Sequence, residues 1–277
     1  MTILVTGATG SVGRLLVDEL VAAGAPVRAL TVNPVKAALP EGVEVAKGYL
    51  GKPETLPEAL KGIDTVYLAP LADTVHDFTK LAKEAGVRRV VALSGSEADD
   101  PPENSSGVEY AIIEKAVREA GFVWTFLRPG AFMNNTLGWA EMIKAEGAVR
   151  EAYGDARITP IDLGDIAAVA AHVLLTEGHD GKKYTLSGPT AVSQKEQVAA
   201  IGTALGTEVP FHELTREEAE KVWAAQGMPD EITQWLLDGF ALLSEYPQEP
   251  TGVVQELTGR AGVSYPEWAM ANVDAFR

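Results

Sequence analysis

One segment of the sequence carries a tyrosine and a lysine that could act together in reducing a carbonyl. It reads EYAIIEKAVREAG, residues 109–121, and has the pattern of a helix. A tyrosine can give a proton to a carbonyl that accepts hydride when a lysine on the same helix face lowers its pKa. Side chains four residues apart are separated by about 40° around a helix, and those five apart by about 140°. Tyr110 and Lys115 are five residues apart, so the spacing predicts that they do not form this pair.

Two interpretations of Tyr110 stay open. Its ring packs against a sheet with the hydroxyl hydrogen-bonded, or the hydroxyl faces a nicotinamide ribose and a substrate as acid or hydrogen-bond donor. We expect Lys115 to be solvated, with Glu119 as a weak i+4 partner. In the segment SGVE we expect Ser106 to accept a hydrogen bond from the backbone at the helix start, while Glu109 reaches back to complete a capping box.

Three glycines lie between the first predicted strand and the first predicted helix, in LVTGATGSVGRLL. At this position they let the chain turn sharply and bring its backbone close to a pyrophosphate, whose charge is held at the helix N-terminus. A tight turn without a ligand is the alternative, although three glycines cost conformational entropy. We expect a dinucleotide here. The predicted contact residues are Thr6, Gly7, Thr9, Gly10, Ser11, Val12 and Gly13.

The sequence after this loop bears on which dinucleotide binds. An acidic residue about 20 positions further on usually holds the ribose 2′-hydroxyl of NAD, but none occurs between Glu19 and Glu41. The absence favours NADP(H) over NAD(H). Thr31, Asn33 and Lys36 lie where the second strand should end, and we expect them to contact the 2′-phosphate. A solvated Lys36 is the alternative.

The elements that must position these residues alternate between strand and helix patterns. Runs of β-branched and aliphatic residues recur between amphipathic stretches and predict strands over residues 2–6, 27–32, 43–48, 64–70, 88–95 and 122–130. The alternation predicts an α/β fold with a Rossmann-type, doubly wound parallel sheet. We expect residues 1–188 to form this NAD(P)-binding domain and residues 189–277 a smaller, mainly helical substrate-cleft domain.

The composition excludes several other classes of protein. The 277 residues include no cysteine and only four histidines, so we expect no disulfide, no thiolate nucleophile and no metal site. The formal net charge of −16 argues against nucleic acid or an anionic membrane as a partner. No apolar run is long enough to span a bilayer, and a strand pattern directly follows the first methionine. We expect a cytoplasmic monomer or homodimer with a small-molecule substrate.

Four segments together resemble the NmrA-like, atypical short-chain dehydrogenase/reductases over nearly the whole chain: VTGATGSVGRLL, GVRRVVALSG, EKAVREAGFVWTFLRPGAFMNN and ITPIDLGDIAAVAAHVL. The resemblance implies a Rossmann domain that binds NAD(P)(H), a small C-terminal domain over the substrate cleft, and either reductase activity or cofactor sensing without catalysis. It also implies that Ser94 orients the substrate carbonyl and contacts the cofactor, and that Pro129, Gly130 and Phe132 lie beside the nicotinamide. We further expect Ala69 and Pro70 to contact the cofactor.

The chain departs from the family pattern at several positions. Tyr49 stands where relatives often have an aspartate that reaches the adenine, so we expect adenine contact from the backbone of Leu50 or from stacking on Tyr49. Val32 stands where many relatives have an arginine. Tyr110 occupies the place of the usual lysine and Ser106 that of the usual tyrosine, so the usual dyad is missing.

These observations predict an NAD(P)H-dependent reductase that passes hydride to a small apolar or aromatic acceptor of the quinone, enone or imine type. Tyr110 or water would be the donor. A non-catalytic NAD(P)-sensing regulator that acts through a protein partner is the alternative. The aromatic residues of the tail are expected in its core or along an apolar substrate pocket. These are Trp223, Trp235, Phe240, Tyr246 and Trp268.

Overall fold

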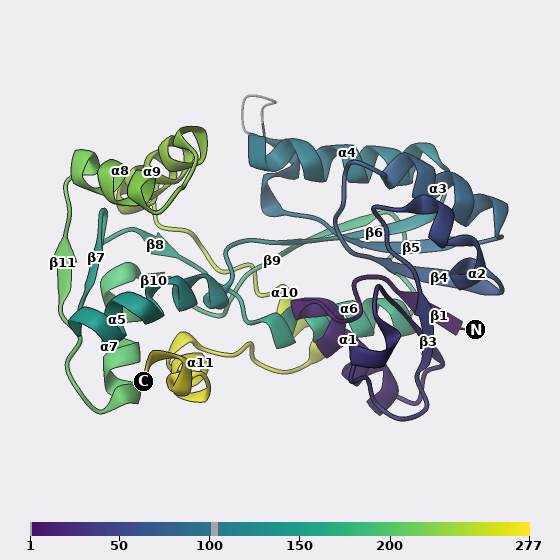
Figure 1. The fold of residues 1–277 in the computed structure, drawn as a ribbon, viewed down its shortest axis with the longest axis horizontal. Helices are drawn as coiled ribbons and strands as arrows, with labels where there is room; N and C mark the ends of the chain where they lie inside the picture. Colours follow the sequence, from purple (N-terminus) through teal and green to yellow (C-terminus); the bar gives the residue numbers. More distant parts are fainter. Residues whose placement is uncertain (1, 101–104) are drawn as a thin grey trace. The chain divides into compact units, whose positions relative to one another are not determined.

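The computed structural model describes residues 2–100 and 105–277, which divide into two compact units (Figure 1). Unit 1 consists of Met1–Gly130, Leu163–Leu186 and Val253–Arg260. Unit 2 consists of Ala131–Asp162, Ser187–Gly252 and Ala261–Arg277. Each unit is therefore built from separated segments of the chain.

Unit 1 is organised around a seven-stranded sheet in the order β3-β2-β1-β4-β5-β6-β9, and all of its strand pairs are parallel. Its strands are β1 (Thr2–Val5), β2 (Val27–Thr31), β3 (Glu44–Lys47), β4 (Ile63–Leu68), β5 (Arg89–Leu93), β6 (Val123–Pro129) and β9 (Lys182–Leu186). The order runs outward in both directions from β1 and β4. This confirms the predicted doubly wound sheet, and ligands of such sheets bind at the carboxyl ends of the strands where the order reverses.

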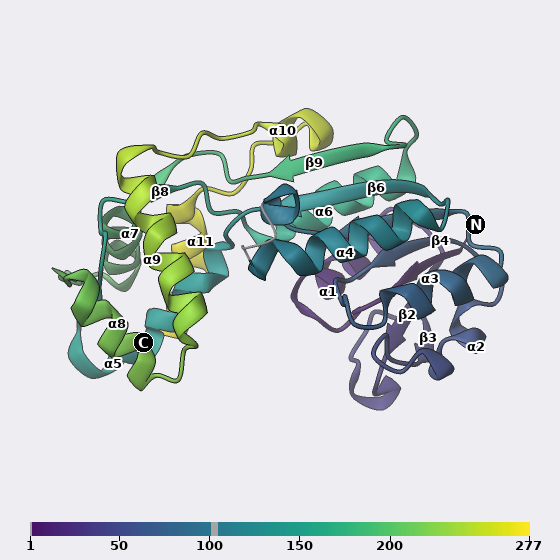
Figure 2. The same cartoon turned by 90° about the horizontal axis from the view of Figure 1, so that it is seen from above.

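Helices cover both faces of this sheet (Figures 1 and 2). One face carries α1 (Ser11–Ala22), α6 (Leu163–Leu175) and α10 (Val253–Thr258), and the other carries α2 (Pro57–Leu60), α3 (Val75–Glu84) and α4 (Ser105–Glu119). The helices form because apolar residues recur at helical spacing; in α1, Val12, Leu16 and Leu20 are buried. On the opposite face, Phe78 of α3 and Ile113 of α4 pack with Val90 of β5 in one apolar cluster.

Unit 2 is mainly helical. Its helices are α5 (Ala140–Glu146), α7 (Gln194–Leu205), α8 (Arg216–Ala225), α9 (Asp230–Glu245) and α11 (Tyr265–Ala271). Its strands are β7 (Val149–Glu151), β8 (Arg157–Ile158), β10 (Val192–Ser193) and β11 (Phe211–Glu213). Tyr265 and Trp268 lie in one apolar core and Trp223 in a second. The expected core placement is therefore confirmed for Trp223 and Trp268, whereas Trp235 and Tyr246 are exposed.

The boundaries of the two units differ from a single cut between residues 188 and 189. Residues 131–162 group with the C-terminal segments because β7 pairs with β11 and β8 with β10. Residues 253–260 return to unit 1, where α10 contacts α6. The assignment of residues 1–188 to the cofactor and 189–277 to the substrate stays a prediction about function.

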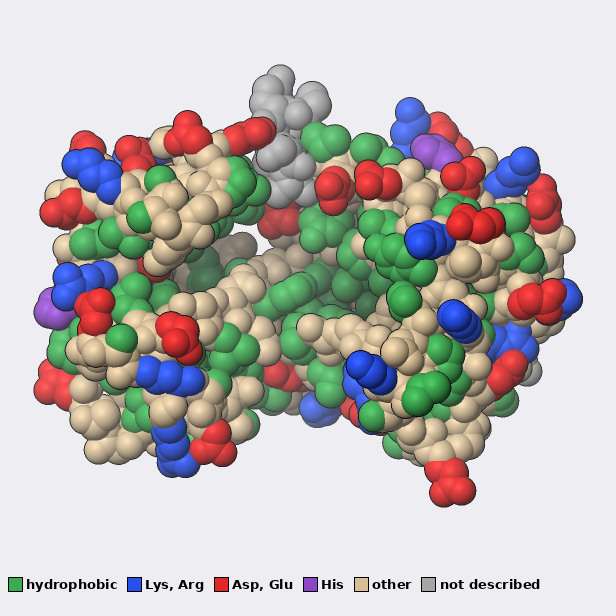
Figure 3. Space-filling model, in the orientation of Figure 1, with side chains coloured by type: hydrophobic (Ala, Val, Ile, Leu, Met, Phe, Trp, Pro, Cys, Tyr) green, Lys and Arg blue, Asp and Glu red, His purple; other side chains and the backbone are tan. Residues whose placement is uncertain are grey.

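The described surface carries charged side chains of both signs. On the face shown in Figure 3, lysine and arginine side chains are interspersed with aspartate and glutamate side chains. In residues 2–100 and 105–277, no helix is long and apolar enough to cross a membrane. The same residues contain no group of three or more histidine, aspartate or glutamate side chains that could hold a metal ion.

Candidate active site

Thr6 ties the loop after β1 to the end of β4. Its buried hydroxyl donates a hydrogen bond to the Tyr67 carbonyl oxygen at 3.0 Å and accepts one from the Ala69 backbone N–H at 2.8 Å. The side chain that was predicted to contact the cofactor is therefore engaged with the neighbouring strand. Thr6 and Ala69 lie side by side at the carboxyl edge of the sheet, and Pro70 follows, exposed to solvent.

The backbone geometry of the loop explains the presence of glycine at each of its three glycine positions. Gly7 has a φ of +60°, and a Cβ there would lie 2.9 Å from the Cβ of Ala69. A Cβ on Gly13 would lie only 2.2 Å from the carbonyl oxygen of Gly7, so the first turn of α1 can approach the loop only without a side chain. Gly10 precedes the helix and donates its N–H to the Gly7 carbonyl oxygen at 2.8 Å. These contacts form the tight, side-chain-free cradle that a pyrophosphate requires.

The N-terminus of α1 is open to an anion. Among the described residues no side chain caps this helix, and its first turn contains no acidic residue. The first backbone N–H groups of a helix have no partner within it and carry a partial positive charge. Thr9 and Ser11 are exposed beside them, and Val12 is buried below. These residues fit a dinucleotide pyrophosphate.

The end of β2 is shaped by a local capping interaction. The side-chain oxygen of Asn33 accepts the Lys36 N–H at 3.3 Å and so caps the 3₁₀ turn Pro34–Lys36. The hydroxyl of buried Thr31 accepts the Asn33 N–H at 3.3 Å. Lys36 itself is exposed and has no ion-pair partner in the described part of the chain, and Val32 is 62% exposed. Lys36 is thus the cation that this turn leaves available.

Tyr49 and Leu50 follow β3 and differ in what they can offer an adenine. The Leu50 carbonyl oxygen accepts the Thr74 hydroxyl at 2.8 Å, and the Leu50 side chain is buried. The Tyr49 ring is half-exposed and lies over Gly51, where a Cβ would come within 2.5 Å of it. A planar exposed surface is therefore present at Tyr49.

Ser94 lies at the end of β5, as predicted, but its hydroxyl is already engaged. The residue is 2% exposed, and its Oγ donates to Oε1 of Glu114 on α4 at 2.7 Å. A serine has one hydroxyl proton, so Ser94 cannot donate the same proton to a substrate carbonyl. In this arrangement the Ser94 hydroxyl proton is held by Glu114, and the orientation of a substrate carbonyl by Ser94 stays a prediction.

Glu114 and Arg128 form a buried ion pair that was not predicted from the sequence. The side chains are 2% and 6% exposed, with Arg128 Nε 2.7 Å from Glu114 Oε1 and Arg128 Nη2 2.8 Å from Oε2. The signal was present in the sequence, because Glu114 interrupts the apolar face of the helix that includes Ile113 and Val117. A charge on a buried helix face demands a partner, and an arginine on a buried strand can supply it.

Asp99 and Lys183 extend this network to the surface. Arg128 Nη2 donates to Asp99 Oδ1 at 3.0 Å, and Lys183 Nζ on β9 lies 3.1 Å from the same oxygen. The hydrogen bond from Arg128 holds the pKa of Asp99 well below its ordinary value, with Lys183 contributing. Burial lowers the pKa of Arg128, but its bonds to Glu114 and Asp99 outweigh this and raise it. Arg128 is therefore a permanent cation with a structural role.

Tyr110 lies one turn before Glu114 on α4, and its ring packs on the backbone of Gly95. A Cβ at position 95 would lie 2.3 Å from Tyr110 Cε2. Burial first, then the charges of Glu97 and Glu109, raise the pKa of the Tyr110 hydroxyl. Lys115 is exposed on α4, with Glu119 at 3.9 Å. The expected separation of Tyr110 from Lys115 agrees with this placement.

The strand ends bring several predicted site residues to one edge of the sheet in unit 1. Thr6, Ala69 and Ser94 directly follow β1, β4 and β5. Pro129 ends β6, and the Gly130 N–H donates to the Leu186 carbonyl oxygen at 3.1 Å. Phe132 belongs to unit 2, where it pairs with Ile161. The predicted capping role of Ser106 falls on a side chain outside the described residues.

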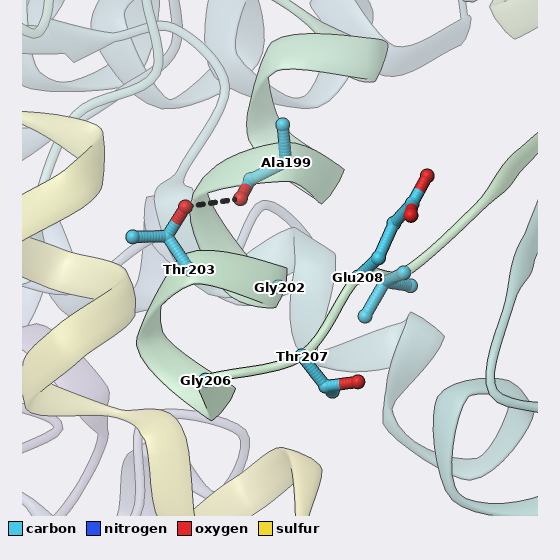
Figure 4. A pocket seen from close by; sticks show the side chains of 7 residues that line it. Ala199, Gly202, Thr203, Gly206, Thr207 and Glu208 are labelled. Atoms are coloured by element: carbon cyan, nitrogen blue, oxygen red, sulfur yellow. Dashed lines mark hydrogen bonds between the residues drawn. The ribbon is translucent and has the colours of Figure 1, made fainter.

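A hollow in unit 2 is lined by few side chains that could take part in a reaction. It lies at the end of α7 (Figure 4) and has a volume of about 490 Å³. Its only ionisable lining residue within the described chain is Glu208, and the Thr203 hydroxyl donates to the Ala199 carbonyl oxygen at 2.9 Å. The edge of the sheet in unit 1 is the better candidate for a catalytic site.

Comparison with known proteins identifies the class that this fold and loop define. A profile described as NAD(P)H-binding matches residues 7–177. The chain therefore belongs to the NAD(P)H-binding family. The matched region begins at Gly7 and includes the glycine loop, β2 to β6 and α6.

Particular relatives match almost the whole chain. The (4-alkanoyl-5-oxo-2,5-dihydrofuran-3-yl)methyl phosphate reductase of Streptomyces griseus is 38% identical over 99% of both chains. The NAD(P)H azoreductase of Xenophilus azovorans is 35% identical, also over 99% of both chains. The NADPH-dependent quinone oxidoreductase QOR2 of Escherichia coli, solved with NADPH, has a TM-score of 0.84 at 27% identity, covering 97% of this chain and 99% of that one.

These relatives confirm that the chain is an NAD(P)H-dependent oxidoreductase. The structural resemblance to NmrA-like proteins is also confirmed, since NmrA, a negative transcriptional regulator, matches with a TM-score of 0.73. Its identity to this chain is 18%, over 97% of this chain and 94% of that one, so the likeness concerns the fold alone.

Proposed function

We propose that this reductase prefers NADPH and passes hydride to a conjugated, electron-poor acceptor of the quinone, enone or imine class. The environment of Tyr110 carries the proposal. Its pKa is raised by burial and by Glu97 and Glu109, and Lys115 lies exposed beside Glu119. Tyr110 therefore stays protonated and is suited to donate a hydrogen bond rather than to release a proton readily.

A tyrosine that donates a hydrogen bond but does not readily release its proton favours some classes of acceptor over others. Hydride addition to a simple ketone produces a localised alkoxide that needs a proton at once, which a lysine-activated tyrosine would supply. Hydride addition to a quinone or an enone produces an anion delocalised onto oxygen, for which a positioned hydrogen-bond donor is sufficient. Tyr110, held on α4 at the carboxyl edge of the sheet, is our candidate for that donor. The bound dinucleotide would supply the hydride.

The cofactor would lie along the loop after β1. We assign the pyrophosphate to the backbone of the glycine loop, from Gly7 to Gly13, with Thr9 and Ser11 beside it. The exposed ring of Tyr49 would stack on the adenine. Pro129 and Gly130 are proposed beside the nicotinamide, together with Ala69 and Pro70 at the neighbouring strand end. Contact of Phe132 with the nicotinamide stays a prediction.

The preference for NADPH rests on the region after β2. No acidic residue lies between Glu19 and Glu41 to hold a ribose 2′-hydroxyl, and Lys36 is exposed without an ion-pair partner in the described residues. Because Asn33 is engaged in capping the turn, we assign the 2′-phosphate mainly to Lys36. One lysine makes a weaker clamp than a bidentate arginine, so NADH should remain a slower substrate.

The names of the relatives support the acceptor class. An azo compound, a quinone and an acylated oxo-dihydrofuran are all conjugated acceptors. We infer that this chain acts on a small molecule of the same kind. A cytoplasmic location and a monomeric or homodimeric state stay predictions.

The test is a panel of acceptors under steady-state conditions with NADPH and with NADH. We expect turnover of a naphthoquinone, an azo dye or cyclohexenone, with kcat/KM at least about tenfold higher for NADPH than for NADH. Cyclohexanone is the matched control, because it differs from cyclohexenone only in lacking the conjugated double bond. Equal turnover of cyclohexanone and cyclohexenone would contradict the proposed acceptor class.

A further inference from the structure

Glu114 connects the helix that carries Tyr110 to two strands of the sheet. Glu114 and Tyr110 are four residues apart, so they lie on the same side of α4. Oε1 of Glu114 accepts one hydrogen bond from Ser94, which follows β5, and another from Arg128, which lies on β6. Both bonds are 2.7 Å long, and the Glu114 side chain is 2% exposed. The carboxylate therefore fixes α4 to β5 and β6 from inside the protein.

Glu114 is not placed to act on a ligand directly. Arg128 donates hydrogen bonds to both carboxylate oxygens of Glu114, and the Ser94 hydroxyl donates a second hydrogen bond to Oε1. A buried carboxylate is costly unless it is paired, and an apolar residue could anchor α4 with less desolvation. The ion pair defines the position of α4, because short hydrogen bonds fix the position of a helix more closely than apolar contact does.

The contact between the Tyr110 ring and the backbone of Gly95 leaves little room for α4 to move. Its ring lies so close to Gly95 that a Cβ there would be 2.3 Å from Tyr110 Cε2. Gly95 directly follows Ser94. The same two residues of the loop after β5 therefore hold the Glu114 carboxylate through a hydroxyl and the Tyr110 ring through a side-chain-free backbone. A shift of α4 would alter both contacts together.

We propose that Ser94, Glu114 and Arg128 form a positioning network that sets the place of the Tyr110 hydroxyl at the carboxyl edge of the sheet. The proposal rests on the proposed function, in which Tyr110 donates a hydrogen bond to the acceptor. Asp99 and Lys183 complete the network, because Asp99 accepts from Arg128 at 3.0 Å and from Lys183 at 3.1 Å and so balances the charge. Ser94 then acts through Glu114 and not on the substrate.

A double-mutant cycle of Tyr110→Phe and Glu114→Gln tests this coupling, with kcat for cyclohexenone and the NADPH dissociation constant as readouts. Glutamine keeps the shape of Glu114 but loses its charge and one acceptor. We expect Glu114→Gln to lower kcat about tenfold when Tyr110 is present and less than about twofold in the Tyr110→Phe background. The NADPH dissociation constant should change less than about twofold in both backgrounds.

Two further variants keep the test decisive. Ser94→Ala removes one hydrogen bond and leaves the ion pair, so it should lower kcat less than Glu114→Gln does. This decrease in kcat should also disappear in the Tyr110→Phe background. Ser94→Ala takes the place of Glu114→Gln in the cycle if Glu114→Gln does not fold. Lys115→Gln, on the exposed side of the same helix, is the control and should leave kcat unchanged.

The possible outcomes separate this inference from the proposed function. If Tyr110→Phe lowers kcat and the effect of Glu114→Gln is the same in both backgrounds, the positioning role is wrong while the donor role stands. If Tyr110→Phe leaves kcat unchanged, the donor role itself is wrong and the positioning role is overturned with it. Loss of NADPH affinity in Glu114→Gln without a kcat effect would also overturn the inference.

Discussion

At the scale of single residues, Gly13 shows how a side chain can be excluded by the backbone. It lies in the first turn of α1, and a Cβ there would lie 2.2 Å from the carbonyl oxygen of Gly7. Neither group is at the end of a flexible side chain, so relief requires movement of the loop or of α1. The same backbone supplies the N–H groups assigned to the pyrophosphate.

We therefore expect Gly13→Ala to raise the NADPH dissociation constant at least about tenfold, as measured by fluorescence titration. Gly138→Ala is the matched control, because a Cβ at Gly138 meets no atom within 4 Å. The control should bind NADPH as the unchanged protein does. Unchanged affinity in Gly13→Ala would show that the cofactor does not use this loop.

The residues of the site were predictable to different degrees. The glycines were identifiable because strand, loop and helix are adjacent in sequence and their geometry is local. Ser94, Glu114 and Arg128 come together across sequence separations of 20 and 14 residues, and the spacing of residues alone does not show which polar groups meet. Glu114 interrupts an apolar helix face, which is a signal for a buried partner, but only the packing of α4 on β5 and β6 identifies Arg128 as that partner.

At the scale of elements, the strands of unit 1 were predictable because each is a short aliphatic run between helical patterns. The small strands of unit 2 were less so: β7 has three residues and β8 has two, too few for an alternating pattern. β7 nevertheless ends in a charged residue with an unusual environment. Glu151 accepts the indole N–H of Trp139 at 3.3 Å and that of Trp223 at 3.1 Å.

Glu151 should make the stability of the protein depend on pH. Burial raises its pKa from 4.5 to about 7, and the two indole donors only partly oppose this. A carboxyl whose pKa is raised on folding contributes stability at low pH, and this is lost as the pH rises through the folded value. We expect the free energy of unfolding to fall by up to about 3 kcal/mol between pH 5 and pH 8.5.

Denaturant unfolding at a series of pH values measures this change, and Glu151→Gln is the informative variant. The amide cannot ionise, so this decrease in stability should be absent, although one indole loses its acceptor at every pH. If the variant and the unchanged protein lose stability in parallel as the pH rises, another group is responsible.

At the scale of the whole molecule, the sequence predicted the class of fold and the class of reaction better than the division of the chain. The glycine loop and the alternation of strands and helices led to an NAD(P)H-dependent reductase, which the relatives confirm. The compact units, however, are made of interleaved segments, because residues 131–162 pair with later strands and residues 253–260 return to α6. Such long-range pairing has no local signal along the chain.

Direct transfer of hydride from a nicotinamide to a conjugated acceptor can be followed with an isotopic label. The most direct measurement uses NADPH that carries deuterium at both positions of C4 and cyclohexenone as the acceptor, with mass spectrometry of the product. We predict one deuterium bound to carbon in the cyclohexanone that forms, because the hydride adds to the conjugated alkene, Tyr110 donates a hydrogen bond to the resulting enolate oxygen, and water supplies the proton. Saturated product without deuterium, or oxidation of NADPH without saturated product, would rule out direct hydride transfer to the conjugated alkene.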